Sequence, residues 1–269
     1  MKKLAFVLAS ATALISAPAL AADLGRMPVK APVAAAVAPF NWSGFYLGAF
    51  AGGAFAAARD GGDVVVVETG PATYNNLIPF AYDLESSFIA GGTIGYNFQA
   101  PGSPLVFGIE GEVGYLRLRG AAAQPGSPAL DTVSATRIGD WYGIIAGRLG
   151  FAFDRALIYV KGGGAFIDRT VDVIDTCNTG LCGPALVNAT GKSDDITWTV
   201  GAGVEFALAP NWSIKAEYLY IDTRDTILAV GNAVPGGAAV SWAHSLPGLH
   251  TAKIGVNFRF GGAPIVASY

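Results

Sequence analysis

The chain has 269 residues and a mass of 27.6 kDa; 52% of its residues are hydrophobic, 36 are glycine, and its formal net charge is -3. An acidic balance without a basic patch argues against nucleic-acid binding. After residue 21, no uninterrupted apolar stretch reaches the roughly 18 residues that a membrane-spanning helix needs. A hydrophobic, glycine-rich chain of this kind favours a β-barrel that crosses a membrane with strands.

The first 21 residues have the three parts of a secretory signal peptide. Lys2 and Lys3 precede an apolar run at residues 4–15, and Ala19, Leu20 and Ala21 form a small-residue cleavage motif. We expect cleavage after Ala21, because the apolar run is too short for a transmembrane helix. Loss of the two lysines lowers the formal charge from -3 to about -5.

Residues 22–40 are rich in Pro and Ala, show no alternation and have little to bury. They are predicted to form a flexible periplasmic leader with some polyproline character. A contact with the cell wall through this leader is the alternative to a plain connection to the barrel.

From Trp42 onward, apolar and small or polar residues alternate in eight stretches, each near the roughly 9 to 11 residues of a tilted membrane strand. The stretches are residues 44–55, 88–99, 105–118, 141–153, 157–168, 197–208, 213–222 and 250–260. Short connections at 100–104, 154–156 and 209–211 alternate with long ones at 56–87, 119–140, 169–196 and 223–249. Outer-membrane barrels have short periplasmic turns and longer external loops.

We therefore predict an all-β fold: a transmembrane, antiparallel, up-and-down β-barrel of eight strands at residues 41–260, followed by a tail at 261–269. An even strand number places both barrel ends on the periplasmic side of the outer membrane. Outer-membrane lipid, including lipopolysaccharide, is then the expected surrounding of the outer wall.

One face of each predicted strand is apolar, and aromatic residues collect at both of its ends. The expected periplasmic girdle is Trp42, Phe98, Phe107, Phe153, Trp212 and Phe260, and the expected external girdle is Phe88, Tyr115, Trp141, Trp198 and Tyr220. A soluble barrel would bury its apolar face and would have no reason for aromatic residues at both rims.

The opposite face carries charges of mixed sign, which are expected to face the lumen: Glu110, Glu112, Arg148, Lys161, Glu205, Lys215, Glu217, Lys253 and Arg259. In a barrel of eight strands there is just room for side chains, so acids and bases are expected to interlock as a plug. The expected pairs are Glu110 or Glu112 with Arg148, and Glu205 with Lys161 or Lys215. A constricted, water-filled pore lined by the same residues is the alternative.

Glycines on the inward face, such as Gly95 and Gly203, are expected to make room for the long Arg and Lys side chains. Cys177 and Cys182 lie on either side of a turn sequence, and an exported protein is expected to join them in a local loop disulfide. A metal site would need further His or Cys ligands nearby, and no cofactor motif is found.

A collinear set of segments carries a family resemblance. The set is Asn41-Trp-Ser-Gly-Phe-Tyr-Leu-Gly48, Gly108-Ile-Glu-Gly-Glu112, Arg148-Leu-Gly-Phe-Ala-Phe-Asp-Arg155, Leu157-Ile-Tyr-Val-Lys-Gly-Gly163, Gly203-Val-Glu205 and Lys215-Ala-Glu-Tyr218. Over residues 41–260 it resembles the outer-membrane immunogenic protein family, small porin-family barrels related to the OmpA-like transmembrane domain.

The resemblance implies abundant surface proteins that stabilise the envelope and present antigenic loops. Porin activity is attributed to the family, and haem or host-factor binding to some relatives. A terminal aromatic residue is recognised by the barrel-assembly machinery in such proteins, and here either Phe260 or Tyr269 would fill that role.

Two other functions compete with that of a structural barrel. An enzyme would need a catalytic His, and only His244, followed by Ser245 in the last external loop, and His250 exist, without a nucleophile motif. An unidentified external ligand would use the loops, where Tyr74, Tyr82, Asp83, Glu85 and Trp242 are candidates, with haem binding at His244 as one version. We expect no catalytic activity.

Overall fold

The computed structural model describes residues 40–57, 61–69, 79–125, 132–176, 186–232 and 239–260, all within the unit Ala38–Tyr269. The expected signal peptide, nearly all of the leader, Tyr74, the Cys177 and Cys182 pair and the C-terminal tail lie outside the described residues and stay predictions. In the described part of the chain, no helix is long and apolar enough to cross a membrane.

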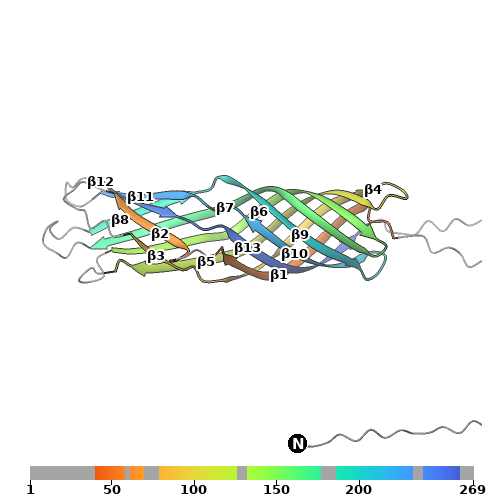
Figure 1. The fold of residues 1–269 in the computed structure, drawn as a ribbon, viewed down its shortest axis with the longest axis horizontal. Helices are drawn as coiled ribbons and strands as arrows, with labels where there is room; N and C mark the ends of the chain where they lie inside the picture. The colour runs from red at the N-terminus through yellow and green to blue at the C-terminus, as the bar shows by residue number, and fades with distance from the viewer. Residues whose placement is uncertain are drawn as a thin grey trace, which may run out of the picture. The chain divides into compact units, whose positions relative to one another are not determined.

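Eight antiparallel strands of the described chain close into a barrel (Figure 1). They are β1 (Gly44–Ala56), β4 (Ser87–Gln99), β5 (Leu105–Ala123), β6 (Thr132–Phe153), β7 (Ala156–Thr176), β9 (Ile196–Ala207), β10 (Trp212–Ile221) and β13 (Leu249–Arg259). Each strand pairs with the next one in this order. The barrel is closed by β13, which pairs with β1; in this pair Leu249 lies opposite Ala56 and Arg259 lies opposite Tyr46. The predicted eight-stranded barrel is confirmed.

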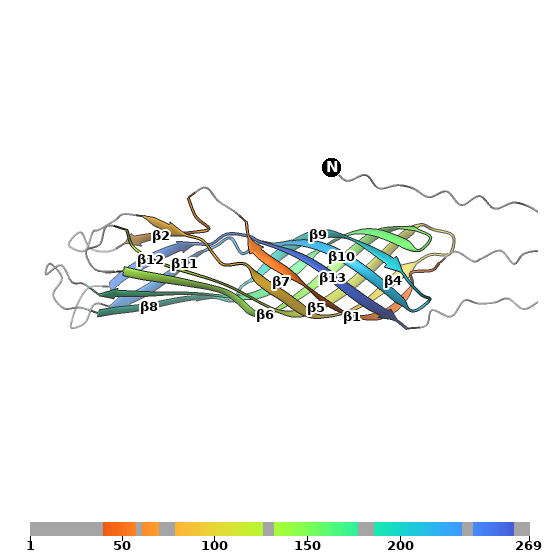
Figure 2. The ribbon, with the colours of Figure 1, turned by 90° about the horizontal axis from the view of Figure 1, so that it is seen from below.

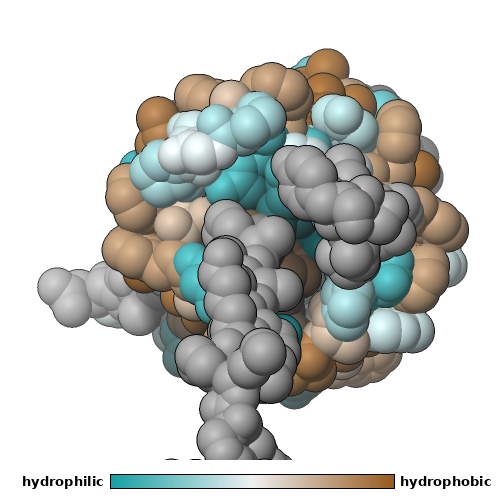
Figure 3. Space-filling model, turned by 90° about the vertical axis from the view of Figure 1, so that its right-hand side faces the viewer, coloured by the Kyte–Doolittle hydropathy of each residue, from teal (hydrophilic) through white to brown (hydrophobic). Residues whose placement is uncertain are grey.

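The side chains alternate between lipid and lumen as expected from the period of two in a strand. Seen along the axis in Figure 3, apolar side chains surround the outer wall and hydrophilic ones lie toward the middle. Exposed aromatic residues lie at both rims, for example Phe98 and Phe153 at one and Phe88 and Trp141 at the other. Trp42 is the exception: it is buried inside the periplasmic end and not part of the girdle.

β5, β6 and β7 continue far beyond the membrane, because they have 19, 22 and 21 residues where about 10 suffice. Five further strands join them on the external side: β2 (Val64–Thr69), β3 (Phe80–Tyr82), β8 (Leu186–Ser193), β11 (Thr226–Asn232) and β12 (Ala239–Ser245). They follow β7 in the order β8, β11, β12, β2, β3. Figure 2 shows β2, β12, β11 and β8 together at this end of the molecule. We call these five strands, with the outer ends of β5 to β7, the external extension.

A bulge in β6 marks the boundary between the membrane barrel and the external extension. The β6 to β7 register shifts between Ile138 and Tyr142, and Gly139 and Asp140 there have positive φ angles of 93° and 138°. Glycine tolerates such a backbone, whereas Asp140 is held in it by its neighbours. Beyond this point β7 exchanges its neighbour β9 for β8.

The external extension encloses an apolar core, contrary to the prediction of four long solvated loops. Val66 on β2, Val171 on β7 and Trp242 on β12 are fully buried in it. Tyr82 and Trp242, considered as external ligand-binding residues, are therefore interior residues, while Asp83 and Glu85 are exposed. The alternation pattern does not identify these strands, because short β-branched runs such as Val64–Thr69 lie between strong turn signals.

Three inward glycines, Gly95, Gly114 and Gly203, make room for tyrosine rings and not, as expected, for Arg and Lys stems. A Cβ at Gly95 would overlap the ring of Tyr46, and one at Gly203 would overlap the ring of Tyr159. Each bulky ring thus lies over a glycine of a neighbouring strand, which lets the small lumen hold both.

Gly95→Val should therefore lower the free energy of unfolding by about 1 to 3 kcal/mol, because Tyr46 must leave its position. Denaturant titration of the barrel refolded in lipid vesicles measures this. Gly92→Val is the matched control on the same strand, since its Cβ would face outward with its nearest contact at 3.5 Å. Equal destabilisation by both variants would contradict the packing argument.

Candidate functional site

The middle of the lumen holds four carboxylates and four cations from β5, β6, β7, β9, β10 and β13. All are almost fully buried: Glu110, Glu112, Arg148, Lys161, Glu205, Lys215, Glu217 and Lys253. They come together because each stands on the inward parity of its strand, near the middle of the membrane span. We call these eight residues the lumen cluster.

Three lysines join the carboxylates of β5 and β10. Lys161 Nζ lies 2.7 Å from Glu110 Oε1, 3.1 Å from Glu112 Oε2 and 2.9 Å from Glu217 Oε1. Lys253 Nζ lies 2.6 Å from Glu112 Oε1 and 2.9 Å from Glu217 Oε1. Lys215 Nζ completes this group at 3.2 Å from Glu110 Oε2. Strands that are not all neighbours are thus connected across the lumen.

Arg148 crosses the lumen to Glu205, with 2.5 Å between Nη2 and Oε2. Glu205 was expected to pair with Lys161 or Lys215, and that prediction is wrong, because both lysines contact glutamates of β5 or β10 and Arg148 pairs with Glu205. The expected contact of Arg148 with Glu110 is present at 3.8 Å. Glu205 also accepts hydrogen bonds from Ser213 Oγ and Asn257 Nδ2, so its buried oxygens have several donors.

Three tyrosines, which the sequence analysis did not single out, add hydrogen bonds to the carboxylates of the lumen cluster. The hydroxyl groups of Tyr46, Tyr142 and Tyr159 donate to Glu110, Glu112 and Glu217 at 2.8, 2.7 and 2.9 Å. The Arg148 guanidinium also lies 3.7 Å from the centroid of the Tyr159 ring. Their inward parity in the predicted strands was the signal that could have identified them.

The lumen cluster has no net formal charge, because four carboxylates face four cations. Buried charges are tolerated only when they are paired and hydrogen-bonded. Glu110, Glu112 and Glu217 lie close enough together to hold a cation, but the ammonium groups of Lys161 and Lys253 already contact them. Each acid and each base of the lumen cluster therefore contacts a group of opposite charge directly.

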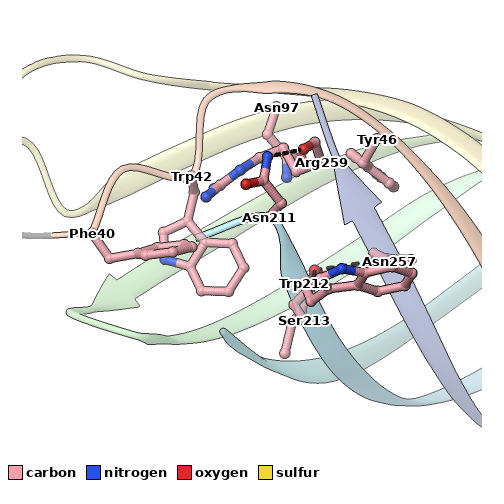
Figure 4. Close-up of a pocket in the computed structure, with 10 residues that line it drawn as sticks. Phe40, Trp42, Tyr46, Asn97, Asn211, Trp212, Ser213, Asn257 and Arg259 are labelled. Atoms are coloured by element: carbon pink, nitrogen blue, oxygen red, sulfur yellow. Dashed lines mark hydrogen bonds between the residues drawn. The ribbon is translucent and has the colours of Figure 1, made fainter. Parts of the chain in front are cut away.

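Arg259 was expected in this network, but it forms no ion pair with the lumen cluster among the described residues and lies at the periplasmic mouth, beside a small cavity that Glu205 also lines (Figure 4). Its guanidinium donates to the backbone oxygens of Asn41 and Pro210 and lies over the rings of Phe40 and Trp42. Among the described residues no carboxylate lies within 4.0 Å of it.

The mouth is nearly closed. Trp42, Val106, Leu157, Tyr159 and Ala207 form a buried apolar layer there, and Trp42 Nε1 donates to Asp154 O. The cavity beside it, lined in Figure 4 by Asn97, Asn211, Ser213 and others, has a volume of only about 10 Å³. That is room for about one water molecule.

At the external end, an apolar layer continues from the barrel into the external extension. Phe50, Ile89, Leu116 and Leu249 belong to the same buried cluster as Trp242. Among the described residues, the lumen thus holds three successive layers: an apolar layer at the external end, the lumen cluster in the middle, and the buried apolar layer at the periplasmic end.

His244, considered as a catalytic or haem-binding residue in a loop, is fully buried on β12. Its Nδ1 lies 3.2 Å from the backbone oxygen of Trp242, and its Nε2 lies 2.7 Å from Ser134 Oγ on β6. Ser134 in turn contacts the hydroxyl group of Tyr82 on β3, at 3.0 Å. Burial holds the pKa of His244 below its usual value and raises that of Tyr82.

His250, the other histidine, is partly exposed at the external rim. Its ring stacks on Phe55 and on Tyr218, whose hydroxyl group lies 2.5 Å from Nδ1. The two histidines do not form a catalytic pair, since one is enclosed in the external extension and the other belongs to the lipid-facing girdle.

Comparisons with known proteins agree on the class of molecule. The model of the outer membrane protein beta-barrel domain matches residues 7–260. The 31 kDa outer-membrane immunogenic protein of Brucella melitensis biotype 1 is 30% identical over 260 residues, which cover 94% of this chain and 98% of that protein. The 22 kDa outer membrane protein of Rhizobium leguminosarum bv. viciae is 29% identical over 188 residues, which cover 68% of this chain and 64% of that protein.

Solved structures are similar at a lower level. A major outer membrane protein from Thermus thermophilus has a TM-score of 0.41 at 12% identity, covering 82% of this chain and 100% of its own. Neisserial surface protein A has a TM-score of 0.36 at 12% identity, covering 81% and 98%.

Removing one cation of the lumen cluster should leave an uncompensated negative charge in a buried site, because four carboxylates would then share three cations. We predict that Lys161→Met lowers the free energy of unfolding by about 3 to 5 kcal/mol, measured by denaturant titration in vesicles. Adding Glu112→Gln should restore part of the loss, because it returns the cluster to zero net charge. Lys192→Met, an exposed lysine on β8, is the control; a loss at Lys161 no larger than at Lys192 would refute the role of pairing.

The buried His244 should make the external extension sensitive to acid. The pKa of His244 is lowered on folding, because burial favours the neutral ring. The stability that the external extension gains from burying a neutral His244 is therefore fully present above about pH 6.5 and decreases as the pH falls toward the folded pKa. Below pH 6.5 the unfolded segment binds a proton that the folded one resists, at a cost of up to about 1.4 kcal/mol per pH unit. Backbone hydrogen exchange of β12 between pH 7.5 and 5 measures the opening free energy. Once corrected for intrinsic exchange, it should decrease in the wild type and not in His244→Gln.

Proposed function

Because this chain belongs to the outer membrane protein beta-barrel domain family and resides in the outer membrane, we propose that it is a structural component of the envelope whose barrel is sealed to solutes and whose external extension is presented at the cell surface. The observation that carries this proposal is the continuous filling of the lumen by the apolar layers and the lumen cluster.

A sealed barrel is supported by the pairing within the lumen cluster. Each of its carboxylates contacts at least one cation, and the periplasmic cavity has room for only about one water molecule. A conducting pore needs the same residue types with water between them. Here the acids and bases instead contact one another directly, which stabilises the tertiary structure across the barrel.

The surface role is supported by the external extension, in which five strands are added beyond the membrane. Its core is apolar, so it presents a folded surface with exposed residues such as Asp83, Glu85 and Lys192. The name of the Brucella relative describes that protein as immunogenic. We propose that the external extension of this chain is likewise the part that antibodies and external ligands reach.

An enzymatic role is disfavoured by the positions of the histidines. His244 is enclosed and has partners on both ring nitrogens, so a substrate or haem would reach it only if the external extension opened. We also propose that Phe260, which is exposed directly after β13 and packs beside Phe258, is the aromatic residue read by the barrel-assembly machinery; Tyr269, outside the described residues, is the alternative.

Conductance across a planar bilayer tests the proposal. The refolded mature protein should show no stable openings, and Glu110→Ala with Glu112→Ala should lose thermal stability, because Lys161, Lys215 and Lys253 then lose carboxylate partners. Stable openings of the wild type, whose ion preference changes in this double variant, would instead establish a pore lined by these carboxylates.

A further inference from the structure

The outer face of β5 and β6 carries three arginines just beyond the external aromatic girdle. Proceeding outward along this strand pair, Tyr115 lies opposite Trp141, Arg117 opposite Gly139, and Arg119 directly opposite Arg137. All three arginines are on the outward parity and are partly or fully exposed. They therefore stand at the level where the headgroups of the outer leaflet begin.

The direct pairing of Arg119 with Arg137 is unfavourable by itself, because like charges opposite each other in a sheet repel. Asp140 balances only part of this charge: it pairs with Arg117 and lies 3.4 Å from Arg137. Glu85 forms a backbone bridge with Arg119, but among the described residues no carboxylate lies within 4.0 Å of the Arg119 guanidinium. An external anion would relieve the repulsion.

An apolar groove of about 790 Å³ lies on the lipid-facing wall and begins at Trp141 of the aromatic girdle, two outward pairs below Arg119 and Arg137. Gly92, Gly111 and Gly143 form part of its floor, and Val113, Trp141 and Phe166 line it. Register places Gly143 opposite Val113, one outward pair below Tyr115 and Trp141. Arginines, aromatic girdle and groove thus follow one another along the same two strands.

We propose that this surface binds a phosphorylated lipid of the outer leaflet, with its phosphate held by Arg119 and Arg137 and an acyl chain lying in the groove. Guanidinium groups match phosphate oxygens with two parallel hydrogen bonds, and basic clusters beside a membrane attract anionic headgroups. The site lies on the outer wall, so the proposal does not depend on whether the lumen is sealed.

The opposite side of the external rim carries mainly acidic side chains. Asp194, Asp195, Asp222 and Asp225 lie around the outer ends of β9 and β10, where Arg224 already pairs with Asp222 and Arg169 with Asp225. The phosphate-binding side of the barrel is therefore the sector of β5 and β6.

The test is native mass spectrometry of the refolded full-length mature protein in detergent, with a chelator to exclude bridging divalent cations. The probe is lipid A, a glucosamine lipid with two phosphates. Arg119→Gln with Arg137→Gln should weaken binding about tenfold or more, as expected for the loss of two charges near a lipid surface. Arg155→Gln, an exposed arginine at the periplasmic rim, is the matched control and should bind as the wild type does.

Two further arms do not depend on the arginine variants. Lipid A without phosphates should bind the wild type as weakly as lipid A binds the double variant. Gly111→Leu should also weaken binding, because its side chain would enter the groove, where the atom nearest to its Cβ lies at 3.6 Å. Equal binding of both lipids, an equal loss in Arg155→Gln, or full displacement by inorganic phosphate would overturn the proposal.

Discussion

The small lumen of an eight-stranded barrel is the constraint on which the rest of this structure depends. Such a barrel has just enough interior for side chains, so charges on the inward face cannot be hydrated and must neutralise one another. Four carboxylates and four cations meet this requirement through contacts such as Lys161 with three glutamates and Arg148 with Glu205. Tyrosines over glycines supply the remaining hydrogen bonds and volume.

The two ends of the barrel are packed differently from its middle. At the periplasmic mouth, Trp42 and its apolar neighbours form a buried layer, and Arg259 is held there by backbone oxygens and aromatic rings. At the external end, the apolar layer merges with the core of the external extension. Burying that core lets the strands continue beyond the membrane as folded structure in place of loops.

Strand parity was enough to predict the membrane barrel and which charges face the lumen, because a period of two assigns every residue to one of two faces. It could not predict which acid meets which base, since partners such as Arg148 and Glu205 lie on strands that are not neighbours. The sequence analysis did not predict the external strands, because runs as short as Phe80–Tyr82 are stabilised as strands only by tertiary packing. Trp42 was misplaced because it precedes β1, where parity no longer applies.

Water access to the lumen tests the central claim most directly. Ala146 faces the lumen from β6 and is buried, so Ala146→Cys in a Cys177→Ser, Cys182→Ser background reports whether reagents enter. The sealed barrel predicts no reaction with a small water-soluble methanethiosulfonate while the protein is folded, although Ser86→Cys on the exposed external side reacts readily. Comparable labelling at both positions would contradict a sealed lumen.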